Sequence, residues 1–543
     1  MGRRGNPVIA HERRVVVVGG GIAGLATAAL LARDGYEVTV LEQHDVVGGR
    51  VGSWESGGFR FDTGPSWYLM PEVFDHFFRL LGTSAAEQLD LVTLDPGYRV
   101  FFEGDPEPID VSAGLAANRS TFERVQAGAG AALDRYLASA RETYRLAVDR
   151  FLYSTFESFR PLLVPDLLRR LARLGRLLLQ PLDRFAAGYV KDRRLRQILG
   201  YPAVFLGTSP SRAPSMYHLM SHLDLEDGVR YPAGGFRTII DRIAALAERE
   251  GVRVETGARV TAIRSAEGAA PRGRPQVTGV DYVDGAGVAH RLEAATVVSA
   301  ADLHHTETEL LPEERRSRPE RWWKGRDPGP GAVLVLLGVS GSLPQLAHHS
   351  LFFTTDWNGD FDRIFGAHPS IPDPASLYVC RPSATDASVA PAGFENLFVL
   401  IPVPADPDIG AGGVDGAGDA RVERAADAAI EQIASWAGIP DLADRIVVRR
   451  TIGPGDFVAD LNAWSGGALG PAHTLRQSAF FRGRNASAVV DGLLYAGGST
   501  IPGIGLPMCL ISAELAVKLM RGDVSTEPLA EPLTATLHGE RVA

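Results

Sequence analysis

Three glycines near the N-terminus have the spacing of a turn that binds a dinucleotide. Gly19, Gly21 and Gly24 form a GxGxxG motif after the β-branched run 15–18, and an Ala- and Leu-rich stretch follows at 25–33. The first glycine permits a sharp turn, the second lets the backbone approach a pyrophosphate, and the third lets a helix pack closely on a sheet. This spacing predicts a strand, a phosphate-binding turn and a helix, in that order.

The predicted helix would bind the phosphates, and an acid would bind the ribose. Ile22 and Ala23 open the helix, whose free N–H groups and positive dipole end attract anions. Glu42 ends the next predicted strand, at 37–42, where its carboxylate can accept hydrogen bonds from both hydroxyls of an adenosine ribose. This acid suits FAD or NAD and repels a 2′-phosphate.

Glycine-rich segments beyond Glu42 favour FAD over NAD. Gly49 and Arg50 are placed to wrap onto the pyrophosphate, and the turn at 61–66 has small residues that suit close packing on a ring system. Near the other end of the chain, the segment 497–505 would aim a second helix N-terminus at the same cofactor. The positive end of that helix would stabilise the charge that a flavin acquires on reduction.

Strand-like segments lie far apart in the sequence, which predicts an α/β protein with a Rossmann-like FAD-binding domain assembled from discontinuous segments. The FAD-binding segments are expected at 13–100, 226–304 and 451–523. Between them we expect a helical region for substrate and membrane association at 101–225, and an inserted α+β substrate-binding domain at 305–450. The polar tail at 524–543 is expected to be disordered.

The composition argues against several classes of function. The chain has 543 residues and a formal net charge of −10, which disfavours nucleic-acid binding. Its two cysteines, Cys380 and Cys509, are far apart, so neither a disulfide framework nor a metal site is expected and a reducing cytosol fits. No signal peptide is expected. Glycines interrupt the uncharged run 15–32, which favours a strand, a turn and a helix over a membrane span.

The sequence resembles the carotenoid desaturases of the bacterial phytoene desaturase type, within the FAD-dependent amine-oxidase-like superfamily, along nearly its whole length. The resemblance lies in the segments VVVVGGGIAGLATAALLARDGYEVTVLEQHDVVGGR, FRFDTGPSWYLMPEVFDHFF, GVRYPAGGFRTIIDRIAALAEREGVRVETGARVTAI, CRPSATDASVAP, LNAWSGGALGPAHTLRQSAFFRGRN and DGLLYAGGSTIPGIGLPMCLISAE. It implies an FAD-dependent enzyme of carotenoid biosynthesis that acts on CH–CH groups and dehydrogenates 15-cis-phytoene stepwise towards lycopene or neurosporene.

The resemblance also implies which residues bind FAD. It assigns the ADP half to the glycine motif with Glu42, Gly49 and Arg50, and the adenine to the backbone at Val260. It assigns the flavin and ribityl chain to Gly498, Ser499, Thr500, Ile504, Gly505 and Leu506. Ile501 departs from the family, because many relatives have a histidine there, so no proton role is carried over to this position.

The catalytic acid or base is left unassigned. Arg141 is the candidate for the active site, because relatives carry arginine in the same helical stretch. Asp62 is interpreted as a turn-forming residue rather than a base. Trp67 and Tyr68 fit the lining of a substrate tunnel and core packing equally.

Two pairs of adjacent histidines are interpreted as surface or core residues. The pairs are His304–His305 and His348–His349. Neighbouring side chains are expected to diverge, so no metal site is predicted.

The stretch 163–179 has the amphipathic pattern of a helix at a membrane surface. Its leucine face comprises Leu163, Leu167, Leu171, Leu174, Leu177 and Leu178, bordered by Arg169, Arg170, Arg173 and Arg176. The alternative is a core-packed helix with a solvated arginine face. Because a carotenoid dissolves only in lipid, we expect a cytoplasmic protein bound peripherally to the inner face of the cell membrane. The oligomeric state stays open.

Other functions on the same fold are alternatives. A C30 diapophytoene desaturase, a carotenoid ketolase or isomerase, and an amine or porphyrinogen oxidase would all keep FAD. A non-catalytic lipid-chaperone module would have lost the flavin determinants. Here the glycine motif, Glu42 and the segment 497–505 are all intact, which weighs against that module.

Overall fold

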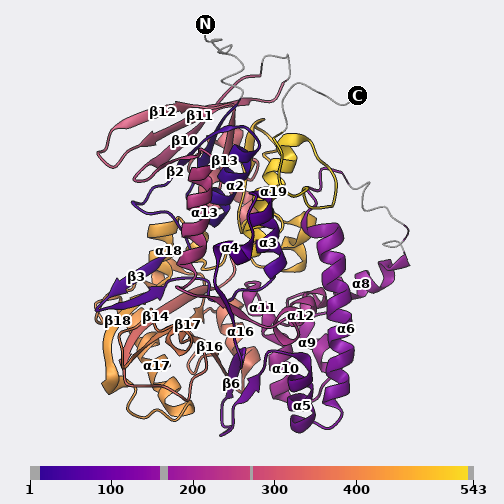
Figure 1. Cartoon of the computed structure of the whole chain (residues 1–543), viewed down its shortest axis with the longest axis vertical. Coiled ribbons are helices and arrows are strands. Elements are labelled where there is room, and N and C mark those ends of the chain that lie inside the picture. The colour runs from indigo at the N-terminus through magenta and orange to yellow at the C-terminus, as the bar shows by residue number, and fades with distance from the viewer. Residues whose placement is uncertain (1–12, 159–164, 166–168, 269–272, 536–543) are drawn as a thin grey trace.

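Figure 1 shows the computed structural model, which describes residues 13–158, 165, 169–268 and 273–535. A region of sheet and helices lies at the top of the view and contains segments from the beginning, middle and end of the chain. Below it lie a second sheet region, with helix α17 (Ala420–Trp436), and a helical region around α6 (Ala129–Ala147).

A five-stranded parallel sheet forms the upper region. Its strands follow the order β19 (Leu493–Tyr495), β13 (Thr296–Ser299), β1 (Arg14–Val18), β2 (Glu37–Leu41) and β9 (Arg253–Glu255). The valines of β1 are buried, because both faces of the sheet are covered. The strand order reverses at β1, and ligands of such sheets bind at the carboxyl ends of the strands beside this point.

Helices cover one face of the parallel sheet, and a small antiparallel sheet covers the other. The helices are α2 (Ile22–Arg33), α13 (Arg237–Arg249) and α19 (Leu506–Arg521). The small sheet consists of β10 (Arg259–Ala266), β11 (Gln276–Val283) and β12 (Ala289–Glu293). Because these elements come from separate parts of the chain, the predicted α/β fold with a discontinuous Rossmann-like sheet is confirmed.

A seven-stranded mixed sheet forms the second region. Its order is β18 (Ile446–Ile452), β14 (Gly331–Ser340), β17 (Phe394–Val403), β16 (Leu377–Cys380), β15 (His349–Phe353), β6 (Tyr98–Phe102) and β7 (Ile109–Val111). Helix α17 packs on one face, and the hairpin of β3 (Ser53–Ser56) and β4 (Phe59–Asp62) packs on the other. The stretch 101–225 was expected to be helical, but β6 and β7 add to this sheet because β6 pairs in parallel with β15.

Shorter elements complete the described chain. The remaining helices are α3 (Pro71–Leu80), α4 (Ala85–Gln88), α5 (Leu115–Val125), α8 (Leu171–Leu179), α9 (Leu182–Ala187), α10 (Arg193–Gly200), α11 (Pro202–Phe205), α12 (Met220–Leu225), α14 (Leu303–Thr308), α15 (Glu320–Trp323), α16 (Trp357–Phe365) and α18 (Pro454–Leu461). Strands β5 (Leu91–Thr93) and β8 (Arg230–Pro232) pair with each other. Within the described ranges, no helix combines the length and apolar composition needed to cross a bilayer.

Helix α8 differs from the predicted membrane helix. Leu163 and Leu167 lie outside the described residues. Leu177 is buried, and its carbonyl accepts a hydrogen bond from Ser215 Oγ at 3.0 Å, so its assignment to a membrane face is wrong. Leu171 and Leu179 are 54% and 75% exposed. Figure 1 shows α8 projecting from the side of the molecule, beside α6.

The arginines beside α8 are engaged by the neighbouring helix. Arg170 and Arg173 both form ion pairs with Glu142 of α6. These contacts fix α8 to α6 and leave less positive charge for lipid headgroups than the sequence suggested.

The predicted disordered tail does not begin at residue 524. Leu533 is buried and its N–H donates to the carbonyl of Leu80 at 3.0 Å, while Lys518 Nζ donates to the carbonyl of Glu527 at 2.6 Å. Residues 524–535 therefore pack onto α3 and α19, because their leucines are apolar enough to be buried. The residues from 536 onward lie outside the described chain.

Candidate cofactor and active site

The first glycine turn has no room for larger side chains. A Cβ on Gly24 would lie 1.9 Å from the carbonyl oxygen of Gly19, closer than any real contact. Gly19 itself has a φ of +96°, which favours glycine. The geometry agrees with the sharp turn predicted at Gly19 and with the close packing predicted at Gly24.

The space in front of Gly21 is open, in contrast. A Cβ there would be 3.9 Å from its nearest neighbours, the Gly48 oxygen and Gly49 Cα. Gly21 is also the N-cap of α2, and no side chain caps this helix or places an acid in its first turn. The N–H groups of the first turn, which includes Ile22 and Ala23, are thus available to an anion. This cradle fits a pyrophosphate.

Glu42 is buried at the carboxyl end of β2. Its Oε2 accepts a hydrogen bond from the Gly20 N–H at 2.6 Å, and its Oε1 accepts one from the His44 N–H at 2.9 Å. Each oxygen keeps lone pairs for further donors, such as the hydroxyls of a ribose. The carboxylate therefore orders the glycine turn, and its predicted contact with a ribose remains a prediction.

Replacing Glu42 with glutamine should weaken FAD binding by about 10–100-fold, or roughly 1.4–2.7 kcal/mol. A glutamine side chain has only one acceptor oxygen, so its NH₂ group would face the N–H of either Gly20 or His44. Two donors would then meet, and one of the two hydrogen bonds would be lost. Titration of apoprotein with FAD, followed by flavin fluorescence, measures the change. Glu37→Gln, at the exposed start of β2, is the control, and equal affinities for the two variants would contradict this role.

The other predicted ADP contacts surround the same strand ends. Val260 lies near the start of β10 and packs in one cluster with Leu41. The loop that precedes β10 is held at the end of β2 by a hydrogen bond of 2.7 Å from the Ala258 N–H to the Glu42 carbonyl. Arg50 donates through Nε to the Ala468 carbonyl at 3.1 Å. The predicted contacts of Val260 and Arg50 with FAD remain predictions.

The C-terminal glycine turn meets the N-terminal one. A Cβ on Gly497 would lie 3.6 Å from the Ala23 Cβ, and one on Gly498 would find its nearest protein atoms at 3.8 Å. Thr500 Oγ1 donates to the Gly497 carbonyl at 2.9 Å and closes the turn. Two segments that are about 470 residues apart in the sequence thus adjoin at the carboxyl ends of β1 and β19.

A second helix N-terminus follows this turn. Gly505 is the N-cap of α19, and Leu506 begins the helix, which has neither a side-chain cap nor an acid in its first turn. Ile504 donates its N–H to His473 Nε2 at 3.2 Å. The geometry provides the predicted positive helix end beside Ser499 and Thr500.

An aromatic cluster lies where the two sheets and the helical region meet. Trp67 is its centre and packs on Tyr98, Tyr201, Phe205, His349 and Tyr378. The His349 ring stacks on Trp67 with centroids 4.6 Å apart. Tyr68 instead stacks on Phe74 in the core. Of the two residues considered for a tunnel, Trp67 alone belongs to this cluster.

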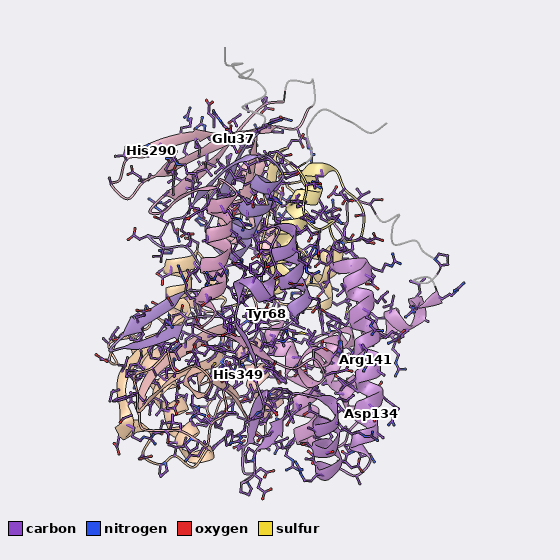
Figure 2. The ribbon with its side chains drawn as sticks, viewed as in Figure 1. Glu37, Tyr68, Asp134, Arg141, His290 and His349 are labelled. Carbon is purple, nitrogen blue, oxygen red and sulfur yellow. The ribbon has the colours of Figure 1, made fainter. Side chains whose placement is uncertain are left out.

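The pair His348–His349 does not diverge as expected. The two rings lie 4.6 Å apart, because His348 precedes β15 and turns onto the same side as His349. His348 Nδ1 bonds to Thr385 Oγ1 at 2.8 Å and His349 Nδ1 to the Tyr378 hydroxyl at 2.7 Å, whereas both Nε2 atoms are buried and have no hydrogen-bond partner among the described residues. Burial holds the pKa of both imidazoles far below the usual range, so both are neutral. Figure 2 shows His349 near the centre of the lower half.

Asp224 is a buried acid that the sequence analysis missed. Its Oδ2 accepts hydrogen bonds from the hydroxyls of Tyr98 at 3.0 Å and Tyr201 at 2.9 Å, both in the aromatic cluster. Burial raises the pKa of the carboxyl to about 7, although the two hydroxyls oppose the shift. No motif marks Asp224 in the sequence, since its partners lie on β6 and after α10.

The two charged candidates from the sequence have structural partners. Arg141 forms an ion pair with Glu226, which also bonds to His222 Nδ1 at 2.7 Å. Figure 2 places Arg141 on α6, away from His349. Asp62 accepts hydrogen bonds from the N–H groups of Phe236 and Arg237 at the start of α13. Burial raises the pKa of Asp62 to about 6. Its role is structural, but its carboxylate caps a distant helix and does not form the local turn that the sequence predicted.

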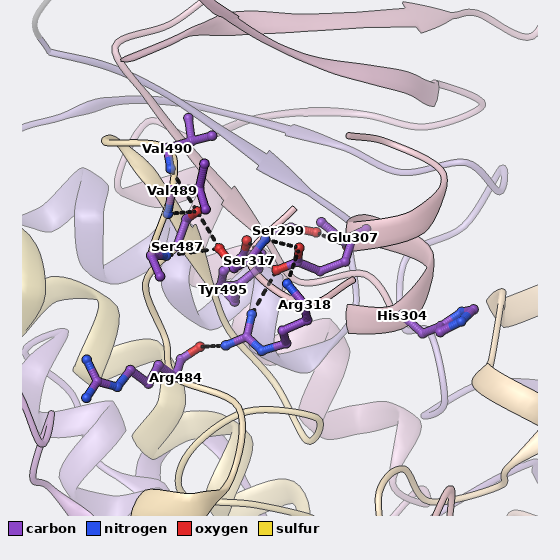
Figure 3. Close-up of polar contacts among 12 residues, drawn as sticks. Ser299, His304, Glu307, Ser317, Arg318, Arg484, Ser487, Val489, Val490 and Tyr495 are labelled. Carbon is purple, nitrogen blue, oxygen red and sulfur yellow. Dashed lines mark hydrogen bonds and ion pairs between the residues drawn. The ribbon is translucent and has the colours of Figure 1, made fainter. Parts of the chain in front are cut away.

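A buried ion pair braces the strand that precedes the C-terminal turn. Figure 3 shows Glu307 accepting hydrogen bonds from Arg318 and from the hydroxyl of Tyr495, each at 2.8 Å. Arg318 also donates to the Arg484 carbonyl at 3.1 Å. This network joins α14 to the end of β19. His304, of the other histidine pair, packs instead against Trp323.

Taken together, the open glycine cradle, the acid at the end of β2 and the two uncapped helix ends define an FAD-dependent oxidoreductase of the two-dinucleotide-binding-domain type. The family model for flavin containing amine oxidoreductase matches residues 22–521. An oxidoreductase from Methanosarcina mazei has the same fold, with a TM-score of 0.57 at 16% identity over 94% of this chain and 100% of that one.

Two relatives narrow the class. A carotenoid 3,4-desaturase of Haloarcula japonica is 40% identical over 512 residues, covering 94% of this chain and 98% of the relative. A zeta-carotene-forming phytoene desaturase of Myxococcus xanthus is 35% identical over 512 residues, covering 93% of each. The chain belongs to the flavin-containing amine oxidoreductase family and, within it, to the carotenoid desaturases. FAD is its cofactor.

Proposed function

We propose that this chain desaturates an acyclic C40 carotenoid, converting a CH–CH single bond of the substrate into a double bond. The identity of 40% to a carotenoid 3,4-desaturase, over nearly the whole length of both proteins, carries the proposal. The bound FAD supplies the two-electron oxidation that the reaction requires. The chain itself must hold an apolar polyene, keep out water and accept a proton.

The aromatic cluster around Trp67 suits the first two tasks. Its rings come from the seven-stranded sheet, the helical region and the segment after β4, so a polyene bound beside them would be enclosed on several sides and held mainly by burial of apolar surface. For the third task the chain offers His348 and His349, whose buried Nε2 atoms have no partner among the described residues and can accept a proton in the tautomer whose Nδ1 carries the hydrogen. Because burial lowers the pKa of both imidazoles, they are weak bases and would take a proton only from a strong acid, such as a carbocation-like form of the substrate. A neutral base conserves charge when it takes a proton from a cationic substrate, which favours the transfer in a site of low dielectric.

Two positions of the new double bond are supported by different relatives. The Haloarcula relative, with the higher identity, favours the 3,4 bond near one end of a conjugated chain. The Myxococcus relative, a zeta-carotene-forming phytoene desaturase, favours phytoene as the substrate. Stepwise conversion of 15-cis-phytoene towards lycopene or neurosporene rests on the sequence resemblance alone.

Parallel incubations separate the two substrates. FAD-loaded protein is given phytoene or lycopene in liposomes, and products are resolved by chromatography and mass spectrometry. Loss of two hydrogens from lycopene, with a red-shifted spectrum, supports the 3,4 position, whereas coloured products from phytoene support the second candidate. If both C40 substrates are unchanged and C30 diapophytoene is converted, the C40 assignment is wrong.

We also propose that the protein binds peripherally to the cytoplasmic face of the membrane, where its substrate is dissolved. Leu171 and Leu179 of α8 are exposed, and so are Phe480 and Phe481 at 45% and 50%. Exposed leucine and phenylalanine side chains gain free energy when they enter the acyl region of a bilayer. Helix α8 and the segment at 480–481 are therefore the expected contact surfaces.

Replacing Leu171 and Leu179 together with serine should lower the partition coefficient into liposomes, measured by sedimentation, by about 30-fold or more. Each leucine loses about 1–2 kcal/mol of transfer free energy, discounted because neither is fully inserted. The control replaces Val414 and Val447, two exposed valines at the far sheet, with serine. If both double variants sediment like the original protein, α8 does not bind the membrane.

A further inference from the structure

Arg482 is a buried cation located directly behind the C-terminal glycine turn. It is 4% exposed. Its guanidinium donates to four backbone carbonyls, those of Gly498, Thr500, Pro471 and Gln477. Within the described chain, no aspartate or glutamate forms an ion pair with it. Two of the four carbonyls belong to the turn at 498–500.

Burying a charge in this way is unfavourable, because backbone dipoles only partly replace its hydration. Burial lowers the pKa of Arg482 to about 10, so the group still carries its proton at neutral pH. Arg318 provides the contrast. It is buried in a neighbouring loop but is neutralised by Glu307, as Figure 3 shows.

The other titratable groups near Arg482 do not cancel its charge. His473 is buried, and burial together with Arg482 holds its pKa far below the usual range, so it is neutral. Burial raises the pKa of Tyr217, and burial raises that of Cys509 to about 11, so both keep their protons. The turn at 498–500 therefore has one full positive charge behind it.

We propose that Arg482 is a positioning residue that serves as the fixed counter-charge for reduced FAD. Its guanidinium fork holds the turn at 498–500, and its charge stabilises the negative charge that the flavin gains on reduction. The uncapped N-terminus of α19, with Gly505 as N-cap, adds its positive dipole from the same side. This inference rests on FAD binding and not on the identity of the carotenoid.

The main test compares Arg482→Met with the original protein after reconstitution with FAD. The midpoint potential is measured by equilibration with a reference dye, and sulfite affinity is measured from loss of the flavin absorbance. We expect the equilibrium constant for two-electron reduction to fall at least tenfold, which corresponds to about 30 mV. Sulfite affinity should fall in parallel, since the adduct also places negative charge on the flavin.

Two further variants keep the outcome decisive. Arg482→Lys retains the positive charge but loses the planar guanidinium fork. Its equilibrium constant for two-electron reduction of FAD should therefore stay within about threefold of the original value. The double variant Glu307→Gln with Arg318→Met removes a buried ion pair that has no net charge. The midpoint potential of FAD bound to this variant should therefore equal that in the original protein. If Arg482→Met does not bind FAD, Arg482→Lys decides the question, because it keeps the charge. A midpoint potential below that of the original protein overturns the proposal, and an unchanged midpoint potential supports it.

Other results would overturn the inference. An unchanged potential in FAD-loaded Arg482→Met would show that the residue only holds the fold. If Arg482→Met weakens the binding of oxidised and reduced FAD equally, then Arg482 acts on the phosphate contacts or on the fold and not on the charge of the reduced flavin. None of these measurements needs a carotenoid, so they stand even if the proposed substrate is wrong.

Discussion

Replacing Gly21 with alanine should lower the affinity for FAD by about 100-fold or more, roughly 2.7 kcal/mol, while leaving the melting temperature of the apoprotein nearly unchanged. The φ of Gly21 is −73°, which alanine adopts easily, and the new Cβ would find no protein atom closer than 3.9 Å. The methyl group would instead occupy the space through which a pyrophosphate approaches the backbone. Calorimetric FAD titration and thermal melts of the apoprotein measure the two effects.

Two other glycines serve as controls for Gly21. Gly24→Ala should destabilise the apoprotein as well, because its Cβ would collide with the Gly19 carbonyl. Gly325→Ala should change neither quantity, since nothing lies within 4 Å of its Cβ position. Undiminished FAD affinity in Gly21→Ala would mean that the pyrophosphate does not lie at this turn.

Asp224→Asn should make the protein more resistant to unfolding at neutral pH than the original, and the gain should vanish in acid. The folded carboxyl has a pKa of about 7, above the unfolded value of 3.8. Its protonated form is thus favoured by folding, so its stability contribution is complete below about pH 4 and is lost as the pH rises to 7. The shift of about three pH units corresponds to about 4 kcal/mol.

Asparagine carries no charge at any pH, and its carbonyl can still accept from Tyr98 and Tyr201. The difference in melting temperature between Asp224→Asn and the original should therefore grow steadily between pH 4 and pH 7 and then level off. Asp444→Asn, at an exposed position, should show no such trend. A difference that stays constant with pH would rule out a protonated carboxyl in the folded protein.

The glycine turn and the acid beside it were predictable because these features are local. Gly19, Gly21 and Gly24 act through one turn, and Glu42 acts at the end of the adjacent strand, so their spacing along the chain reflects their spacing in space. The aromatic and acidic groups could not be found in this way. Asp224 bonds to Tyr98, 126 positions earlier, and no periodic pattern connects such partners.

Helix α8 shows a different limit of the sequence. Its leucine and arginine pattern is equally consistent with a lipid face and with a protein face. The structure buries Leu177 and pairs Arg173 with Glu142, while Leu171 stays exposed. Amphipathicity reports that one face is apolar and does not report what covers it.

By itself, the sequence determined that the oxidant is FAD. The βαβ unit with the glycine motif and Glu42 is formed by residues that are close together in the chain, so its structure depends little on the rest of the fold. Only the tertiary structure decided which distant groups surround that oxidant. It brought Gly497 against Ala23, set the neutral rings of His348 and His349 together, and left the charge of Arg482 unpaired behind the turn. The reason is physical: burial and the pairing of charges depend on contacts between distant segments, and these exist only once the sheets have assembled.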